Sequence, residues 1–185
     1  LNKAFNDVIK EANYKGNYNG VYPIKVNQIR EVVEEIVDAG APYDFGLEAG
    51  SKPELLAVLA YNTNANSLTI LNGYKDEEFI KLALLGRKLG RKVVIVVEKF
   101  SEVAMIVKLS KELDREPIIG LRSKMRSKGQ GRWEGSSGDR AKFGLTISEI
   151  INAARYLEEH GMADSLKLLH FHIGSQLTDI RAVKE

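Results

Sequence analysis

Residues 92–122 read KVVIVVEKFSEVAMIVKLSKELDREPIIGLR and contain one full unit of a pattern that runs through the chain. The runs at 92–99 and 116–122 are apolar at almost every position and rich in β-branched residues, which is typical of strands covered on both faces in a parallel sheet. The segment between them, at about 101–114, has a helical pattern. We therefore expect a strand, a helix and a second strand parallel to the first.

Similar runs lie on both sides of this stretch. The first five candidate strands are centred 22 to 25 residues apart, which is the length of a strand, a helix and two short loops. The further strands are predicted at VYPIKV (21–26), PYDFGLEA (42–49), SLTILNG (67–73) and LKLLHFHIG (166–174).

Helical patterns separate these runs. Apolar residues from Ile147 to Leu157 fall on one face at the 3.6-residue period. Ser51 with Glu54 and Thr146 with Glu149 fit the capping box that begins many helices. Other helices are predicted at about 2–13, 28–39 and 75–89.

Alternating strands and helices leave two architectures, an open doubly wound sheet or part of a (β/α)₈ barrel. A nucleotide-binding doubly wound domain has a glycine-rich phosphate loop after its first strand, and VYPIKVNQIR (21–30) contains no glycine. A full barrel typically takes about 250 residues. Six βα units with one insertion already account for all 185 residues of this chain. We therefore predict an α/β fold, an incomplete (β/α)₈ TIM barrel of about six βα units with parallel strands.

The composition indicates one globular domain. The chain has 185 residues, 44% of them hydrophobic, and no cysteine, which excludes disulfides, thiolate metal sites and cysteine nucleophiles. No apolar run approaches the roughly 20 residues of a membrane span. We therefore expect no membrane partner and a cytoplasmic location.

A basic, glycine-rich insertion is predicted at 124–140. Between Arg122 and Lys142, seven Lys or Arg residues stand against two acidic ones, so the stretch carries +5 in a chain whose formal net charge is +2. Its glycines and serines predict a loop, which we expect to be mobile without a cofactor or partner. The charge and Trp133 could contact nucleic acid, but no aromatic residues alternate along a strand, so nucleic acid is not an expected partner.

Lys25 is the first candidate for chemistry. It lies near the carboxyl end of the first predicted strand, where barrel enzymes carry their active sites. Because Ile24 and Val26 flank it, we expect its amine to be pushed toward the neutral form that attacks a carbonyl. The alternative is an ordinary lysine at a strand end that reaches into solvent.

Two histidines and two charged residues end other strands. His170 and His172 are two residues apart, so both point to one face, where they could stack on a flat cofactor or be core histidines; a metal site lacks a third ligand. Gly174 and Ser175, which follow them, could contact a phosphate. Glu48 and Arg122 end the second and fifth strands. They could bind a ligand, or they could form a salt bridge across the rim of the barrel.

Four motifs together resemble the bacterial biosynthetic arginine decarboxylases, which are pyridoxal-phosphate enzymes with an alanine-racemase-type barrel. The resemblance extends, in order, over essentially all 185 residues. The motifs are YPIKVNQ (22–28), GLEAGSKPEL (46–55), KGQGRW (128–133) with GDRAKFGL (138–145), and HFHIGSQ (170–176).

The resemblance implies a role for each candidate. Lys25 would form the Schiff base with pyridoxal phosphate, and His172 would stack on the pyridine ring. Ser175 would help to hold the phosphate, Arg122 would lie near the phenolic oxygen of the cofactor, and Glu48 would lie close to the lysine. Magnesium is implied by the resemblance alone.

The resemblance further implies conversion of L-arginine to agmatine and CO2 in polyamine (putrescine and spermidine) biosynthesis, by a homo-oligomer. Residues 1–185 would then form part of the pyridoxal-phosphate-binding barrel, with a C-terminal β-domain and further cofactor contacts outside this chain, so the isolated chain is expected to be inactive. Alternatives are a non-catalytic pyridoxal-phosphate carrier domain, a decarboxylase of the same barrel family for another basic amino acid, and a nucleic-acid-binding module.

Overall fold

The computed structural model describes residues 1–124 and 143–173. Apart from Lys124, the predicted insertion at 124–140 lies outside the described residues, as does Ser175. What the sequence predicts for these two regions therefore stays a prediction.

The described strands form one six-stranded sheet in which every neighbouring pair is parallel. The strands lie side by side in the order in which they occur along the chain, whereas doubly wound sheets reverse direction at a switch point. This order confirms the predicted partial barrel. The strands are β1 (Val21–Pro23), β2 (Gly46–Ala49), β3 (Leu68–Leu71), β4 (Lys92–Val97), β5 (Ile118–Arg122) and β6 (Leu166–His170).

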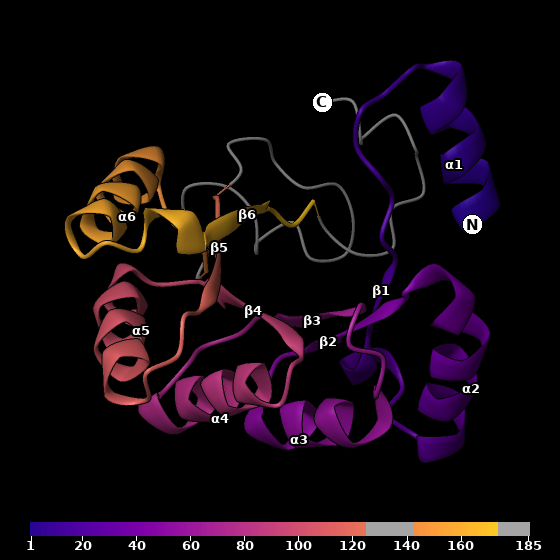
Figure 1. Ribbon diagram of the computed structural model, residues 1–185, viewed down its shortest axis with the longest axis horizontal. Helices are drawn as coiled ribbons and strands as arrows, with labels where there is room; N and C mark the ends of the chain where they lie inside the picture. The colour runs from indigo at the N-terminus through magenta and orange to yellow at the C-terminus, as the bar shows by residue number, and fades with distance from the viewer. Residues whose placement is uncertain (125–142, 174–185) are drawn as a thin grey trace.

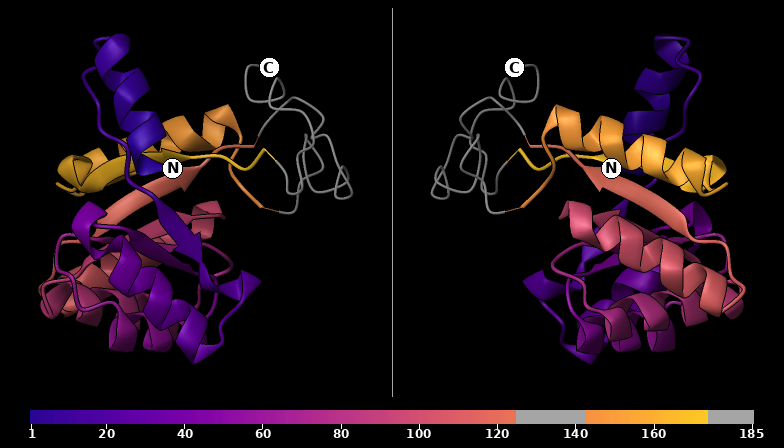
Figure 2. Two further views of the ribbon diagram at one scale, coloured as in Figure 1. Left: turned by 90° about the vertical axis from the view of Figure 1, so that its right-hand side faces the viewer. Right: turned by 90° about the vertical axis from the view of Figure 1, so that its left-hand side faces the viewer.

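Helices cover the outer side of the curved sheet (Figures 1 and 2). Each of α2 to α6 lies in the sequence between the two strands that it connects, close to its predicted position. Helix α1 is joined to β1 by residues 12–20 and has no buried residue (Figure 1). The helices are α1 (Asn2–Glu11), α2 (Arg30–Gly40), α3 (Lys52–Tyr61), α4 (Glu77–Lys88), α5 (Phe100–Glu112) and α6 (Ile147–Glu159), with short 3₁₀ turns at Ile24–Val26, Ala41–Tyr43 and Ala163–Ser165.

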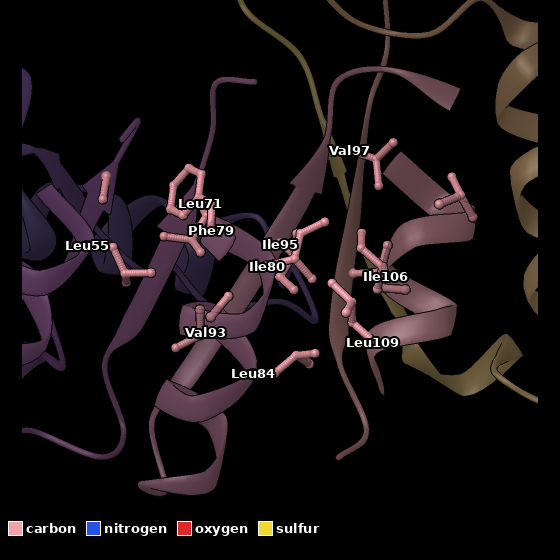
Figure 3. Close-up of a cluster of buried hydrophobic side chains, with 14 of the residues drawn as sticks. Leu55, Leu71, Phe79, Ile80, Leu84, Val93, Ile95, Val97, Ile106 and Leu109 are labelled. Atoms are coloured by element: carbon pink, nitrogen blue, oxygen red, sulfur yellow. The ribbon is translucent and has the colours of Figure 1, made fainter. Parts of the chain in front are cut away.

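The core has two layers, one on each face of the sheet. On β4, Val94 and Val96 join Ile70 in a small inner cluster, with partly buried side chains of β1, β5 and β6 around it. Val93, Ile95 and Val97 point the other way, into the larger cluster between sheet and helices. Both faces of β4 are therefore dry, which explains its continuous apolar run. Figure 3 shows the outer cluster, including Leu55, Leu71, Phe79, Ile80, Leu84, Ile106 and Leu109.

The strands are shorter than the sequence predicts. The run 21–26 pairs with β2 only through Pro23, and the backbone then makes a 3₁₀ turn that buries Ile24 and exposes Val26. The run 166–174 leaves the sheet after His170, so His172 follows β6 rather than lying on it. An apolar run does not mark where the backbone bends away from its neighbour, because turn residues can bury their side chains too.

One of the two predicted capping boxes is complete. At α6, the Thr146 hydroxyl accepts from the Glu149 backbone N–H at 3.3 Å, and the Glu149 carboxylate accepts from the Thr146 N–H at 2.8 Å. At α3, the Ser51 hydroxyl accepts from the Glu54 N–H at 3.4 Å, but the Glu54 carboxylate accepts from the N–H of Gly50 instead. The second box is thus formed in one direction only.

The complete box gives a local test of the fold. Thr146→Ala removes the cap and should cost about 1 kcal/mol of helix stability, so amides of the first turn of α6 should exchange about fivefold faster. Thr146→Ser keeps the hydroxyl and is the control. Hydrogen exchange read by mass spectrometry measures both, and equal exchange in the two variants would contradict the assignment of the cap.

Candidate active site at the carboxyl end of the barrel

Inward-facing positions at the carboxyl ends of neighbouring strands carry the candidate residues. Glu48 on β2 pairs in register with the inner residue Ile70, and Arg122 on β5 pairs with His170 on β6. Lys25 lies in the 3₁₀ turn that follows β1. The parallel sheet thus brings four strand ends to one rim.

Lys25 and Glu48 form an ion pair, with 3.7 Å between Nζ and Oε1. The Lys25 side chain is 61% exposed and that of Glu48 is 19% exposed. The two apolar neighbours of Lys25 do not enclose its amine, because the 3₁₀ turn directs Ile24 into the core and leaves Val26 in solvent. Among the described residues, Glu48 is the acidic side chain in contact with Lys25.

Arg122 pairs with Glu98, a residue that the sequence analysis missed. The guanidinium Nη1 donates to both carboxylate oxygens of Glu98, at 3.0 and 3.1 Å. Glu48 and Arg122 both form ion pairs, but they do not pair with each other. Glu48 pairs with Lys25, and Arg122 pairs with Glu98. A signal for Glu98 was present, because it continues the inward positions Val94 and Val96 by two residues.

The two histidines lie in the field of these charges. Partial burial lowers the pKa of His170, and a weaker loss of solvent lowers the pKa of His172, which is exposed; the positive charge of Arg122 lowers both further. Glu48 and Glu98 act on both rings in the opposite direction, as expected for two imidazoles on the same side of the chain. Leu169 and Phe171, between and beside them, are exposed. The imidazoles are therefore held toward their neutral form.

A second buried pair lies next to this rim and was also missed. Lys75 and Glu102 have side chains that are 1% exposed, with 3.9 Å between Nζ and Oε2. Burial lowers the pKa of Lys75 and raises the pKa of Glu102, and each charge opposes the shift of the other. In NGYKDEE (72–78), Lys75 has the appearance of a loop lysine, so nothing in its neighbours predicts burial.

These residues fit a flat, anionic aldehyde such as pyridoxal phosphate. Lys25 offers an amine, His172 a flat ring and Arg122 a fixed cation. Two buried polar atoms on this side of the sheet, Asn72 Oδ1 and His170 Nδ1, have no hydrogen-bond partner among the described residues, as expected where a polar ligand would complete the site. Two surface hollows of the described chain, between α2 and α3 and between α1 and α2, contain none of these residues.

Residues 1–124 and 143–173 contain neither a candidate metal site nor a candidate membrane span. No group of three or more His, Asp or Glu side chains there is arranged to hold a metal ion. No helix in this part of the chain has the length and apolar character needed to cross a membrane.

The field of Arg122 can be tested on the histidine. Arg122→Gln should raise the pKa of His172, because it removes a cation that disfavours the imidazolium and leaves the negative Glu98, which favours it. Hydrogen exchange at the imidazole C2 position, followed by mass spectrometry across pH, measures this midpoint. Arg30→Gln removes an equal charge from an exposed pair with Glu34 on α2 and is the control. An unchanged or lower midpoint in Arg122→Gln would contradict this account.

Comparison with known proteins gives the family. Residues 1–185 match the family model described as "Pyridoxal-dependent decarboxylase, pyridoxal binding domain". Biosynthetic arginine decarboxylases of Bacteroides thetaiotaomicron and Deinococcus radiodurans are 52% and 53% identical over the whole of this chain, which spans 29% and 28% of their lengths.

Solved structures agree. The biosynthetic arginine decarboxylase of Campylobacter jejuni superposes with a TM-score of 0.88 at 38% identity, over 98% of this chain and 28% of that one. Diaminopimelate decarboxylase of Helicobacter pylori, at 22% identity and a TM-score of 0.71 over 98% of this chain and 44% of that one, shares the fold. This chain belongs to the family of pyridoxal-dependent decarboxylases, whose pyridoxal-binding domain it matches from end to end.

Proposed function

We propose that the protein carrying this domain is an arginine decarboxylase that converts L-arginine to agmatine and CO2 for polyamine biosynthesis, with pyridoxal phosphate held on Lys25. The observation that carries the proposal is the Lys25–Glu48 pair at the carboxyl rim of a barrel whose relatives at about half identity are named biosynthetic arginine decarboxylases. The diaminopimelate decarboxylases are similar at a level that supports the fold alone.

The proposed roles follow from the chemistry of each side chain. Bound pyridoxal phosphate would accept the electron pair left behind when CO2 departs. Lys25 anchors the cofactor and holds or releases a proton at Nζ, with the Glu48 carboxylate 3.7 Å away. His172 would stack on the pyridine ring of the cofactor, and Arg122 would supply a fixed positive charge near its phenolic oxygen.

Lys75 is the strongest competitor for the role of Lys25. Its burial lowers the pKa of the amine, which on electrostatic grounds alone favours a nucleophile. However, its Nζ donates to the Gly73 carbonyl oxygen at 2.6 Å and is enclosed, with no surface through which a cofactor could approach. Lys25 is exposed toward the rim, so access favours it.

Reduction with borohydride in the presence of pyridoxal phosphate, followed by peptide mapping, distinguishes the two lysines in the whole protein. The label should fall on Lys25, and Lys25→Ala should abolish both the label and CO2 release. Lys75→Met, which keeps an apolar chain of similar length, should leave the label on Lys25. Label on Lys75, with Lys25 unmodified, would rule out the assignment.

Other parts of the proposal rest on the family resemblance. They are the phosphate contact of Ser175, a magnesium ion, a homo-oligomeric assembly and a cytoplasmic location. The proposed domain organisation, with 1–185 as part of the barrel and further cofactor and substrate contacts elsewhere, agrees with the share of the relatives' length that this chain spans.

This organisation predicts that residues 1–185 alone do not decarboxylate arginine. The six strands of residues 1–124 and 143–173 leave the barrel open between β1 and β6. Losing even one preorganised electrostatic contact can cost about 3 kcal/mol in a transition state. Release of labelled CO2 from arginine, with saturating pyridoxal phosphate and magnesium, should be near background for this chain. Turnover within tenfold of the whole protein would overturn the prediction.

A further inference from the structure

Four buried or nearly buried charges form a connected group beneath the proposed cofactor site. We call Lys75, Glu98, Glu102 and Arg122 the rim cluster. It comprises two cations and two carboxylates, so its formal charge is zero. It joins three segments that follow neighbouring strands: the turn after β3, the start of α5 after β4, and the end of β5.

Glu98 is the centre of the rim cluster. Its side chain is fully buried, and both carboxylate oxygens accept from Arg122 Nη1. One of these oxygens also accepts from the Gly73 backbone N–H at 2.7 Å. Its backbone carbonyl accepts from the Gly144 N–H at 3.1 Å, so Glu98 also holds the chain where it returns to the barrel.

Glu102 and Lys75 fix Glu98 from the other side. The Glu102 carboxylate accepts from the backbone N–H of Glu98 at 2.9 Å and from that of Lys75 at 3.2 Å. The Lys75 ammonium donates to the Gly73 carbonyl oxygen, next to the N–H that Glu98 binds. The contacts thus form a closed path, and the Glu98 carboxylate is held at both its backbone and its oxygens.

Stability alone is a poor explanation for this arrangement. Removing ions from water is costly, and replacing a buried ion group by apolar residues of similar volume is often neutral or stabilising. The rim cluster instead fixes a geometry, because a guanidinium that donates to two oxygens of a held carboxylate keeps one position and orientation. Of the four residues, Arg122 is the one that pairs in register with His170 on β6. Its positive charge lowers the pKa of both histidines, and the negative charge of Glu98 raises them.

We infer that Glu98 is a positioning residue, which fixes the Arg122 guanidinium for contact with the cofactor, and that Glu102 and Lys75 hold Glu98 in place. This inference rests on the proposed function, which assigns Arg122 to the cofactor. Glu98 does not touch the cofactor and acts through Arg122.

A double-mutant cycle in the whole protein tests the inference. The dissociation constant of pyridoxal phosphate is measured by visible absorbance on Glu98→Gln, Arg122→Gln and the double variant, and the unfolding temperature of each cofactor-free protein is measured in parallel. Glu98→Gln should weaken cofactor binding about tenfold, the scale of one charge-assisted hydrogen bond. In the Arg122→Gln background the same change should have no further effect on the dissociation constant.

The unfolding temperatures separate positioning from support of the fold. Either single change leaves one charge of the pair buried, so each should lower the unfolding temperature, and the double variant should recover part of the loss. Leu84→Ala in the outer core is the matched control: it should lower the unfolding temperature and leave the dissociation constant within twofold. If Glu98→Gln does not fold, weaker cofactor binding by the double variant than by Arg122→Gln alone would still contradict the inference.

Two results would overturn the inference: an unchanged dissociation constant in Glu98→Gln, or equal weakening by Glu98→Gln with and without Arg122. Failure of the proposed function looks different, because the unsubstituted protein would then show no visible band that depends on Lys25.

Discussion

Strand β4 is buried along both faces from Val93 to Val97, so charge can be accommodated only where the strand ends. The first residue beyond it is Glu98, on the inward side that continues from Val94 and Val96. Its carboxylate cannot be left unpaired in a dry environment, and it accepts from Arg122 on the next strand and from the Gly73 N–H in the turn after the previous strand. The site geometry thus follows from the burial of the sheet.

The same constraint arranges the charges of the rim in pairs. Lys25 is next to Glu48, Arg122 next to Glu98, and Lys75 next to Glu102, while the histidines are held toward neutrality. Exposure differs strongly among the pairs. The Lys25–Glu48 pair is open to solvent on the lysine side and can exchange a proton or a ligand. Lys75, Glu102 and Glu98 are enclosed, whereas the Arg122 side chain is 16% exposed and can contact a ligand while Glu98 holds it.

Much of the fold could be predicted from the sequence, because strand spacing and doubly buried runs such as 92–99 report directly on a parallel sheet. Lys25 is a candidate because of its place at a strand end and its motif, but its surroundings differ from the expectation, since local sequence does not reveal that the backbone makes a 3₁₀ turn at Ile24. Lys75 and Glu102 could not be found, because the partners that make their burial tolerable are 27 residues apart. Glu98 could have been predicted, because side chains of β4 alternate between the two faces of the sheet and Glu98 is the next inward position after Val94 and Val96.

A crystal structure of the whole protein with pyridoxal phosphate tests the central claim most directly. The account predicts continuous density between the cofactor and Lys25 Nζ at the carboxyl rim, with His172 against the ring and Arg122 still bound to both oxygens of Glu98. Cofactor joined to Lys75, or bound away from the rim formed by β1, β2, β5 and β6, would contradict it.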